Sequence, residues 1–397
     1  MSEFTSDDFM NNPSRLLGAM REEAAIVRRR MPFIGKVWVT TNQSSAATVL
    51  KDNVTFTQRK SDGSVPLMRW WMPRSLQLLS GNMLTSDEPD HTRLRKLVDQ
   101  AFRRKTILAL EPNIEKIANE LVENLFVQND RCDLVDEFAR VFPLSVICEM
   151  LGLPQEDREI FSRWAEGLTK VTGPISIIKA LPGLKSMTAY LQDRIEHVRT
   201  HGGKGMIADL VQAEAEGARL SSDELVAMVF LLLVAGHETT THLISGGVLA
   251  LLQNPKQKQL LLEDWGKADL AVEELLRFVS PVAFTKPRYP QKDVEIEGVQ
   301  IKKGELIMLC LVAANYDPAV IDAPEKLDLM RRPNRHMGFG AGIHFCLGHQ
   351  LARLEGRVAL RALFTRYPQL ALADEQVHWR KRFGLRALDR LDIVSGL

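Results

Sequence analysis

The residues best suited to chemistry lie in one loop, Phe339-Gly340-Ala341-Gly342-Ile343-His344-Phe345-Cys346-Leu347-Gly348. Its three glycines permit tight or left-handed backbone, and the apolar spacing that follows predicts a helix over about 347–367. Cys346 therefore precedes a helix N-terminus, where free N–H groups and the helix dipole favour a thiolate. Such a cysteine is a candidate nucleophile or metal ligand. A buried structural cysteine is the alternative.

A second candidate site lies in the middle of a long apolar stretch, at Ala235-Gly236-His237-Glu238-Thr239-Thr240. Ser221 and Glu224 form the pattern of a capping box, and Asn254-Pro255 ends the helix. The predicted helix has about 33 residues and a length of roughly 50 Å. A glycine and polar groups in a buried helix are costly, so their presence suggests a function. Polar groups satisfied by partners are the alternative.

The spacing F-x-x-G-x-x-x-C-x-G, with Phe339, Gly342, Cys346 and Gly348, resembles the haem-binding loop of the cytochrome P450 family. The resemblance implies a mainly α fold with minor β structure and a long central helix over a buried haem. It implies haem b (iron protoporphyrin IX) as cofactor, with Cys346 as the iron ligand and Phe339 and Gly348 beside it. A thiolate ligand pushes electron density onto the iron and favours O–O cleavage.

The long helix resembles the family's A-G-x-[D/E]-T motif. By this resemblance Gly236 leaves room for dioxygen, while Glu238 and Thr239 relay protons during its activation. Glu274 and Arg277 share one helix face and resemble the family's structural ion pair. Either Arg332 or the segment 334–336 is expected to meet that pair.

Haem propionates need cationic or hydrogen-bonding partners. By the resemblance, the matching residues are His91, Arg95, Arg288 and His344. One departure lies in Ala314-Asn315-Tyr316-Asp317-Pro318, because the family's usual text is A-N-R-D-P. Tyr316 therefore stands in place of a cation.

The segments that line the family's substrate pocket are largely apolar here. The candidate pocket residues are Trp70, Trp71, Val282, Phe284 and Leu385. They predict an apolar small-molecule substrate, such as a natural product, a terpenoid or a fatty-acid-like compound. For the two tryptophans, packing on the surface is the alternative.

Composition excludes several other classes of protein. The 397 residues include 51 Lys+Arg and 50 Asp+Glu, so the net charge of +1 does not support nucleic-acid binding. Four cysteines without CxxC pairing argue against a disulfide framework and favour a reduced, cytoplasmic compartment. The longest apolar run, Leu225–Gly236, is shorter than the roughly 20 residues of a membrane span. The polar, acidic N-terminus is not a secretory signal.

We expect one domain over 1–397, with a short flexible N-terminus over about 1–12. Strands are predicted at Val37–Thr41, 294–296, 299–301 and 306–311, and a hairpin around 383–388. Between 113 and 218 the spacing is helical, and Pro154, Pro174 and Pro182 are expected to break it. The sheet segments are spaced too irregularly for a doubly wound fold.

The resemblance implies a haem-thiolate monooxygenase that uses dioxygen. The chain has no flavin or iron–sulfur motif, so electrons are expected from a separate ferredoxin or flavodoxin and its reductase. A basic docking face is expected from Arg103-Arg104-Lys105, Arg331-Arg332 and Arg353. The alternatives are a peroxide-driven peroxygenase, a haem protein that only binds ligands, and a cysteine hydrolase built on Cys346.

Overall fold

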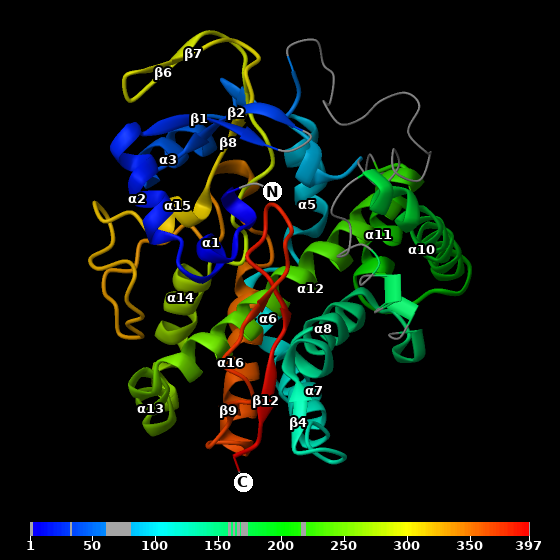
Figure 1. Ribbon diagram of the computed structural model, residues 1–397. Helices are drawn as coiled ribbons and strands as arrows, with labels where there is room; N and C mark the ends of the chain where they lie inside the picture. Colours follow the sequence, from blue (N-terminus) through cyan, green and yellow to red (C-terminus); the bar gives the residue numbers. More distant parts are fainter. Residues whose placement is uncertain are drawn as a thin grey trace.

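The computed structural model describes residues 3–31, 34–60, 81–157, 160, 161, 163, 164, 167, 174–215 and 220–396. Trp70 and Trp71 lie outside these residues. Helices make up most of the described chain, and short sheets gather at its edges (Figure 1). The α-helices are α1 (Asp7–Asn11), α2 (Ser14–Glu23), α3 (Gln43–Lys51), α5 (Asp90–Asp99), α6 (Arg104–Ala109), α7 (Glu111–Glu123), α8 (Val141–Leu151), α10 (Pro174–His201), α11 (Met206–Ala215), α12 (Ser222–Gln253), α13 (Pro255–Glu263), α14 (Ala268–Val279), α15 (Leu311–Asn315) and α16 (His349–Arg366).

Helix α12 is the predicted long helix, and it runs through the middle of the molecule (Figure 1). The predicted capping box is confirmed, because the Ser221 hydroxyl accepts from the Glu224 N–H at 3.2 Å and the Ser221 N–H donates to Glu224 Oε2 at 2.8 Å. By length and composition α12 could span a membrane, but 72% of its most apolar window is buried inside the protein. It is therefore the core helix of the fold.

The largest hydrophobic core surrounds α12. Helices α8, α10, α14 and α16 pack against it, and α7 packs against α16. The core includes Leu225, Val229, Leu243 and Leu251 of α12, all at most 3% exposed. Because α12 is covered on several sides, its apolar residues are needed nearly all the way round.

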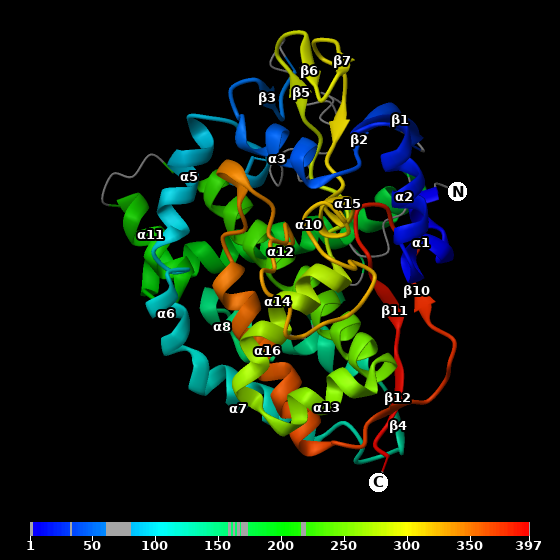
Figure 2. The same cartoon turned by 90° about the vertical axis from the view of Figure 1, so that its left-hand side faces the viewer.

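Five small sheets complete the described part. Strand β1 (Ile26–Met31) pairs antiparallel with β2 (Gly35–Thr40), which pairs parallel with β8 (Ile307–Met308). The other pairings, all antiparallel, join β3 (Phe56–Thr57) to β5 (Tyr289–Pro290), β6 (Val294–Ile296) to β7 (Val299–Ile301), β12 (Asp392–Val394) to β4 (Arg131–Asp133) and β9 (Ala371–Leu372), and β10 (His378–Trp379) to β11 (Leu388–Arg390). Seen from the side, β6 and β7 stand at one end, beyond the helices (Figure 2).

Near the N-terminus, η1 (Glu3–Thr5) and α1 bury Phe4, Phe9 and Met10 in a second core. Two expectations need correction. Pro182 does not break its helix but lies inside α10, whose buried side chains after the proline hold it in place. The strand predicted at 306–311 is shorter, since the chain turns into α15 at Leu311.

Candidate functional site

The glycine-rich loop holds Cys346 at the start of α16. Gly340 and Gly342 have φ of +69° and +71°, and a Cβ on Gly342 would lie 1.9 Å from the Leu50 carbonyl oxygen. The Cys346 N–H donates to the Phe339 carbonyl at 3.0 Å. Burial raises the pKa of the Cys346 thiol, and the Gly348 N–H opposes this by donating to the sulfur. The loop therefore presents one sulfur, supported by a backbone donor, at a helix N-terminus.

Helix α5 is tied to the same loop. Arg95 Nη1 donates to the carbonyls of Ile343 at 3.0 Å and Phe345 at 2.8 Å. The rings of His91 and His344 lie 4.4 Å apart between centroids. Burial and nearby cations lower the pKa of His344 to about 3, and burial lowers the pKa of His91. His91 Nδ1 is buried and has no hydrogen-bond partner in the described chain.

Arg288 is a buried cation, only 5% exposed. Its Nη1 donates to two carbonyls nearby, those of Pro287 at 3.2 Å and Lys286 at 3.4 Å. No carboxylate of the described residues lies within ion-pair distance of it. Burial lowers its pKa to about 10. Such a buried guanidinium calls for an anionic partner.

Helix α12 opens toward this region at its centre. Ala235 is exposed, and Gly236 and Thr239 are half-buried, although they belong to a core helix. The hydroxyl of Thr239 donates back to the Ala235 carbonyl at 3.0 Å. A Cβ on Gly236 would press against Ile147 of α8 at 3.2 Å. The lack of a side chain at Gly236 therefore lets α12 pack closely against α8 and also leaves the face of α12 open to the cavity.

The open face of α12 and the Cys346 loop border one cavity of about 160 Å³. Its lining residues are Met83, Leu84, His91, Arg95, Phe102, Ile147, Leu231, Leu232, Ala235, Gly236, Thr239, Thr240, His344, Phe345, Cys346, Leu347, Gly348, Leu351, Ala352 and Glu355. Seven of the predicted site residues, from α5, α12 and the loop, thus meet around one space: His91, Arg95, Gly236, Thr239, His344, Cys346 and Gly348.

Glu238 is held at the edge of this region by a residue that the sequence did not predict. Glu238 is 9% exposed, and its carboxylate forms an ion pair with Nη1 of Arg382, in the loop between β10 and β11. The basic run Arg380-Lys381-Arg382 was the available signal. A contact over 144 positions of the chain cannot be predicted from that run alone.

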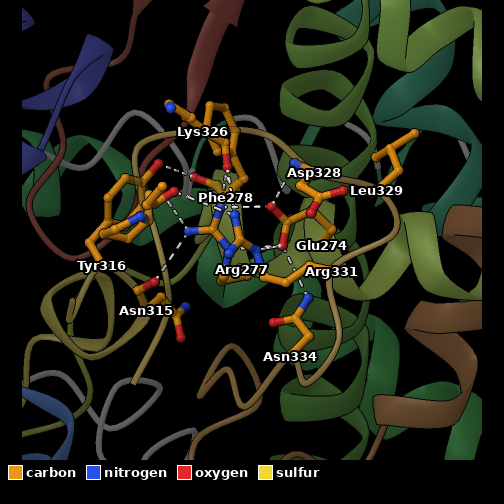
Figure 3. A network of polar contacts seen from close by, with 12 residues as sticks. Glu274, Arg277, Phe278, Asn315, Tyr316, Lys326, Asp328, Leu329, Arg331 and Asn334 are labelled. Carbon is orange, nitrogen blue, oxygen red and sulfur yellow. Dashed lines mark hydrogen bonds and ion pairs between the residues drawn. The ribbon is translucent and has the colours of Figure 1, made fainter. Parts of the chain in front are cut away.

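Glu274 and Arg277 form a fully buried ion pair on α14, and both are 0% exposed (Figure 3). Glu274 contacts Arg277 through both oxygens, each at 2.8 Å. It also accepts from Arg331 Nε at 3.1 Å, Asn334 Nδ2 at 3.1 Å and the Asp328 N–H at 3.0 Å. Both carboxylate oxygens of Glu274 therefore accept hydrogen bonds, which offsets the cost of removing this buried charge from water.

The same network shows what Tyr316 does. Its ring lies 5.4 Å from the Arg277 guanidinium carbon, and its hydroxyl donates to the Phe278 carbonyl at 2.8 Å (Figure 3). The aromatic face stabilises the buried cation. Arg331 is also buried here, at 9% exposure, so its predicted place on an exposed basic face is wrong.

The other candidate pocket residues either do not line the cavity or lie outside the described residues. Val282 and Leu385 pair as an isolated bridge, and the ring of Phe284 stacks on Phe383 at 4.9 Å. None of these residues lines the cavity. Phe339 packs under the guanidinium of Arg353, whose carbon lies 4.4 Å from the ring centroid.

Comparison with known proteins agrees with this geometry. A family model described as "Cytochrome P450" matches residues 183–382. The chain is 38% identical over 393 residues to the polyketide biosynthesis cytochrome P450 PksS of Bacillus subtilis, covering 97% of this chain and 96% of the relative. The chain belongs to the cytochrome P450 family. This P450 is also 41% identical to a vitamin D(3) 25-hydroxylase of Pseudonocardia autotrophica, over 98% and 96% of the two chains.

A solved structure supports the predicted fold of this P450. Myxobacterial CYP267B1, in complex with myristic acid, matches with a TM-score of 0.91 at 35% identity, covering 99% of this chain and 98% of the other. The mainly α fold with minor β structure is confirmed. The protein is a haem-dependent monooxygenase, as its relatives are. The hydrolase and the non-catalytic alternatives are thereby set aside.

The described residues fit a haem. The cavity has apolar walls on α12 and α16 and one thiol at its border. At its edge lie buried polar groups that suit carboxylates. One is His91, whose Nδ1 has no hydrogen bond and lies 3.7 Å from Glu88 Oε1. The other is Arg288, with no carboxylate among the described residues within ion-pair distance. A flat apolar group with anionic side chains matches both features.

Proposed function

We propose that this P450 oxidises an apolar small molecule at a haem held by Cys346. The observation that carries the proposal is the cavity that has Cys346 at one wall and Gly236 and Thr239 at the other. Bound haem supplies the activation of dioxygen, and thiolate ligation favours O–O cleavage. Arg95, Arg288, His91 and His344 would hold the propionates, because the rings of His91 and His344 lie side by side and the charges of Arg288 and Arg95 act on His344.

Within this proposal, the residues of α12 serve the proton supply. Thr239 lines the cavity, and Glu238 immediately precedes it on the same turn of α12. We assign proton uptake to the Glu238 carboxylate and proton delivery to the Thr239 hydroxyl. Arg382 orients the acid through its ion pair. Glu274 and Arg277 are assigned a structural role, since they are fully buried and do not line the cavity.

The substrate and the electron donor are proposed at the level of class. Leu231, Leu232 and Ile147 give the cavity an apolar wall, and the similar CYP267B1 structure holds myristic acid. The sequence carries no flavin or iron–sulfur motif, and we propose that electrons come from a ferredoxin or flavodoxin with its reductase. The exposed run Arg103-Arg104-Lys105 is the proposed docking surface. We place the protein in the cytoplasm.

The test of the proposal is the absorption spectrum of the reduced protein under carbon monoxide. The wild type should show the long-wavelength Soret band of thiolate ligation. Cys346→Ser should lose this band, whereas Cys132→Ser, in β4 and away from the cavity, should keep it. A wild-type band at the position given by histidine ligation, or an intact band in Cys346→Ser, would overturn the assignment of Cys346.

A further inference from the structure

His242 of α12 is a buried imidazole whose two ring nitrogens both lack a partner among the described residues. The residue is 3% exposed, and neither Nδ1 nor Nε2 forms a hydrogen bond within the described chain. His237 of the same helix differs, because its Nδ1 is hydrogen-bonded to the Leu233 carbonyl at 2.7 Å. A neutral imidazole has one donor and one acceptor nitrogen, and leaving both unmet in the interior is costly. The His242 ring therefore calls for a bound polar molecule.

His242 stands one helical turn after Glu238. Residues four positions apart on a helix share one face, and their Cβ atoms are about 5–6 Å apart. Neither residue lines the cavity, whose α12 wall includes Gly236, Thr239 and Thr240. The acid and the imidazole therefore share a second face of α12, next to the face that lines the cavity.

The loop between β10 and β11 covers this second face at Glu238. Arg382 of the loop pairs with Glu238 Oε1, whereas Oε2 receives no hydrogen bond from a described residue. Strand β11, which follows the loop, also packs against α12. Arg380 of the loop, with a side chain only 10% exposed, pairs at 3.0 Å with Asp389, whose side chain is 61% exposed. The loop thus joins the covered face of α12 to a polar surface.

The ring of His242 is suited to binding water. Burial, followed by the charges of Arg380 and Arg382, lowers its pKa to about 3, so the ring is neutral at neutral pH. A neutral ring accepts at one nitrogen and donates at the other, and it does not compete with Arg382 for the acid. A buried water molecule forms about three hydrogen bonds with groups that would otherwise be unpaired. The His242 ring and Glu238 Oε2 offer such groups on adjacent turns of one helix face.

We propose that His242 is a positioning residue of the proton supply, whose ring holds bound water against Glu238 so that protons reach the acid from the β10–β11 side of α12. This inference deepens the proposed function and rests on the haem site assigned there. The water bound at His242 gives a proton to the Glu238 carboxylate and takes one from the next water outward, so it is regenerated. Glu238 then gives up its proton on the Thr239 side and returns to the carboxylate.

A packing role is the competing explanation, because His242 lies in the core helix. The two explanations differ in the side chains that can replace the ring. A packing role needs an apolar group of similar size, so His242→Leu would be tolerated. A water site needs a polar group, so His242→Asn would be tolerated and His242→Leu would not.

The experiment supplies the haem-loaded protein with dioxygen and with myristic acid, the ligand of the similar CYP267B1 structure. Electrons come from a [2Fe–2S] ferredoxin and its reductase, and the fraction of consumed dioxygen released as hydrogen peroxide is measured. Where proton delivery is slow, dioxygen that has gained two electrons and two protons leaves as peroxide before its O–O bond is cleaved. His242→Leu should raise the peroxide fraction several-fold, and His242→Asn should stay near the wild type.

Two further variants sharpen the test. Thr241→Val removes a buried hydroxyl next to His242 that donates to the His237 carbonyl of the same helix at 2.9 Å, so the peroxide fraction should not change. Glu238→Gln should raise the fraction, and adding His242→Leu to it should raise it no further, because both residues serve one path. A His242→Leu variant that matches the wild type would overturn the proposal. So would a His242→Asn variant that fails as His242→Leu does.

A crystal structure of the haem-loaded wild type gives a measurement that does not depend on how the variants fold. Ordered water is expected within about 3.2 Å of a His242 ring nitrogen, and it should continue to Glu238 Oε2. A ring enclosed by apolar atoms alone would contradict the water site.

The carbon monoxide spectrum separates these results from a failure of the proposed function. If the wild type and the variants keep the long-wavelength band, an unchanged peroxide fraction overturns only the role of His242. If the wild type lacks that band, the haem assignment itself has failed, and the role of His242 fails with it.

Discussion

At the scale of single residues, Glu355 of α16 is the most unusual side chain bordering the cavity. It is 1% exposed, and neither carboxylate oxygen has a hydrogen-bond partner in the described chain within normal geometry. Burial raises its pKa well above the usual value, and Thr240 on the facing helix opposes this only in part. Burial therefore favours the neutral form of the Glu355 carboxyl.

This leads to a prediction for the pH dependence of stability. A carboxyl with a raised folded-state pKa favours folding fully below its unfolded pKa, and that contribution is lost as the pH rises toward the folded value. Glu355→Gln keeps the shape and removes the ionisation. At pH 8 we expect its melting temperature to exceed the wild-type value by a few degrees, with a smaller difference at pH 5.

Thermal unfolding of the haem-loaded protein at both values of pH provides the measurement. Glu123→Gln makes the same chemical change at an exposed position of α7 and should have no such effect. A Glu355→Gln variant less stable than the wild type at pH 8 would contradict the prediction. It would mean that the carboxylate is charged and paired in the loaded protein.

At the scale of elements, the cysteine loop is fixed by its contact with α3. Gly342 and Gly340 share a left-handed backbone, but only Gly342 meets another element. Its Cβ would lie 1.9 Å from the Leu50 carbonyl, while nothing lies within 4 Å at Gly340. Substitutions at the two glycines can therefore distinguish the effect of backbone strain from the effect of losing the contact between the loop and α3.

Alanine at each position should give different results. Gly340→Ala introduces only strain, about 1–2 kcal/mol. Gly342→Ala adds a collision with backbone atoms, so α3 or the loop must move, and Cys346 moves with the loop. We expect Gly342→Ala to lose haem during gel filtration while Gly340→Ala retains most of it. Equal haem retention by both variants would show that the contact with α3 does not position the loop.

Local sequence patterns predicted the bounds of several elements closely. They could not predict contacts between segments that are distant in the chain. The capping box at Ser221 placed α12 to within a residue, because a cap is a local interaction. The segment that meets Glu274 was predicted, yet the choice of Arg331 over Arg332 depends on which side of the turn faces α14. The pairing of Glu238 with Arg382 depends on how the β10–β11 hairpin is packed, which no local pattern encodes.

At the scale of the whole molecule, a basic surface lies next to the cavity, because Phe102, which lines the cavity, is followed directly by basic residues. Phe102 of the segment after α5 lies 3.9 Å from where a Cβ on Gly348 would stand, so the next residues, Arg103 and Arg104, are near the start of α16. Arg103, Arg104 and Lys105 are exposed. Arg353, also expected at this face, is instead paired with Glu273. The surface that remains for an acidic partner is the start of α6.

Reversing one charge of this surface should slow electron delivery. Arg104→Glu should lower the rate of reduction by a negatively charged [2Fe–2S] ferredoxin several-fold at low salt, because steering depends on complementary charge. The effect should shrink as the ionic strength is raised to the physiological value, at which the Debye length is about 8 Å. Substrate affinity should stay unchanged, since Arg104 does not line the cavity. Arg15→Glu makes the same change on α2, which lies across the molecule from α6 (Figure 2). If it slows reduction as much as Arg104→Glu does, net charge and not this surface guides the partner.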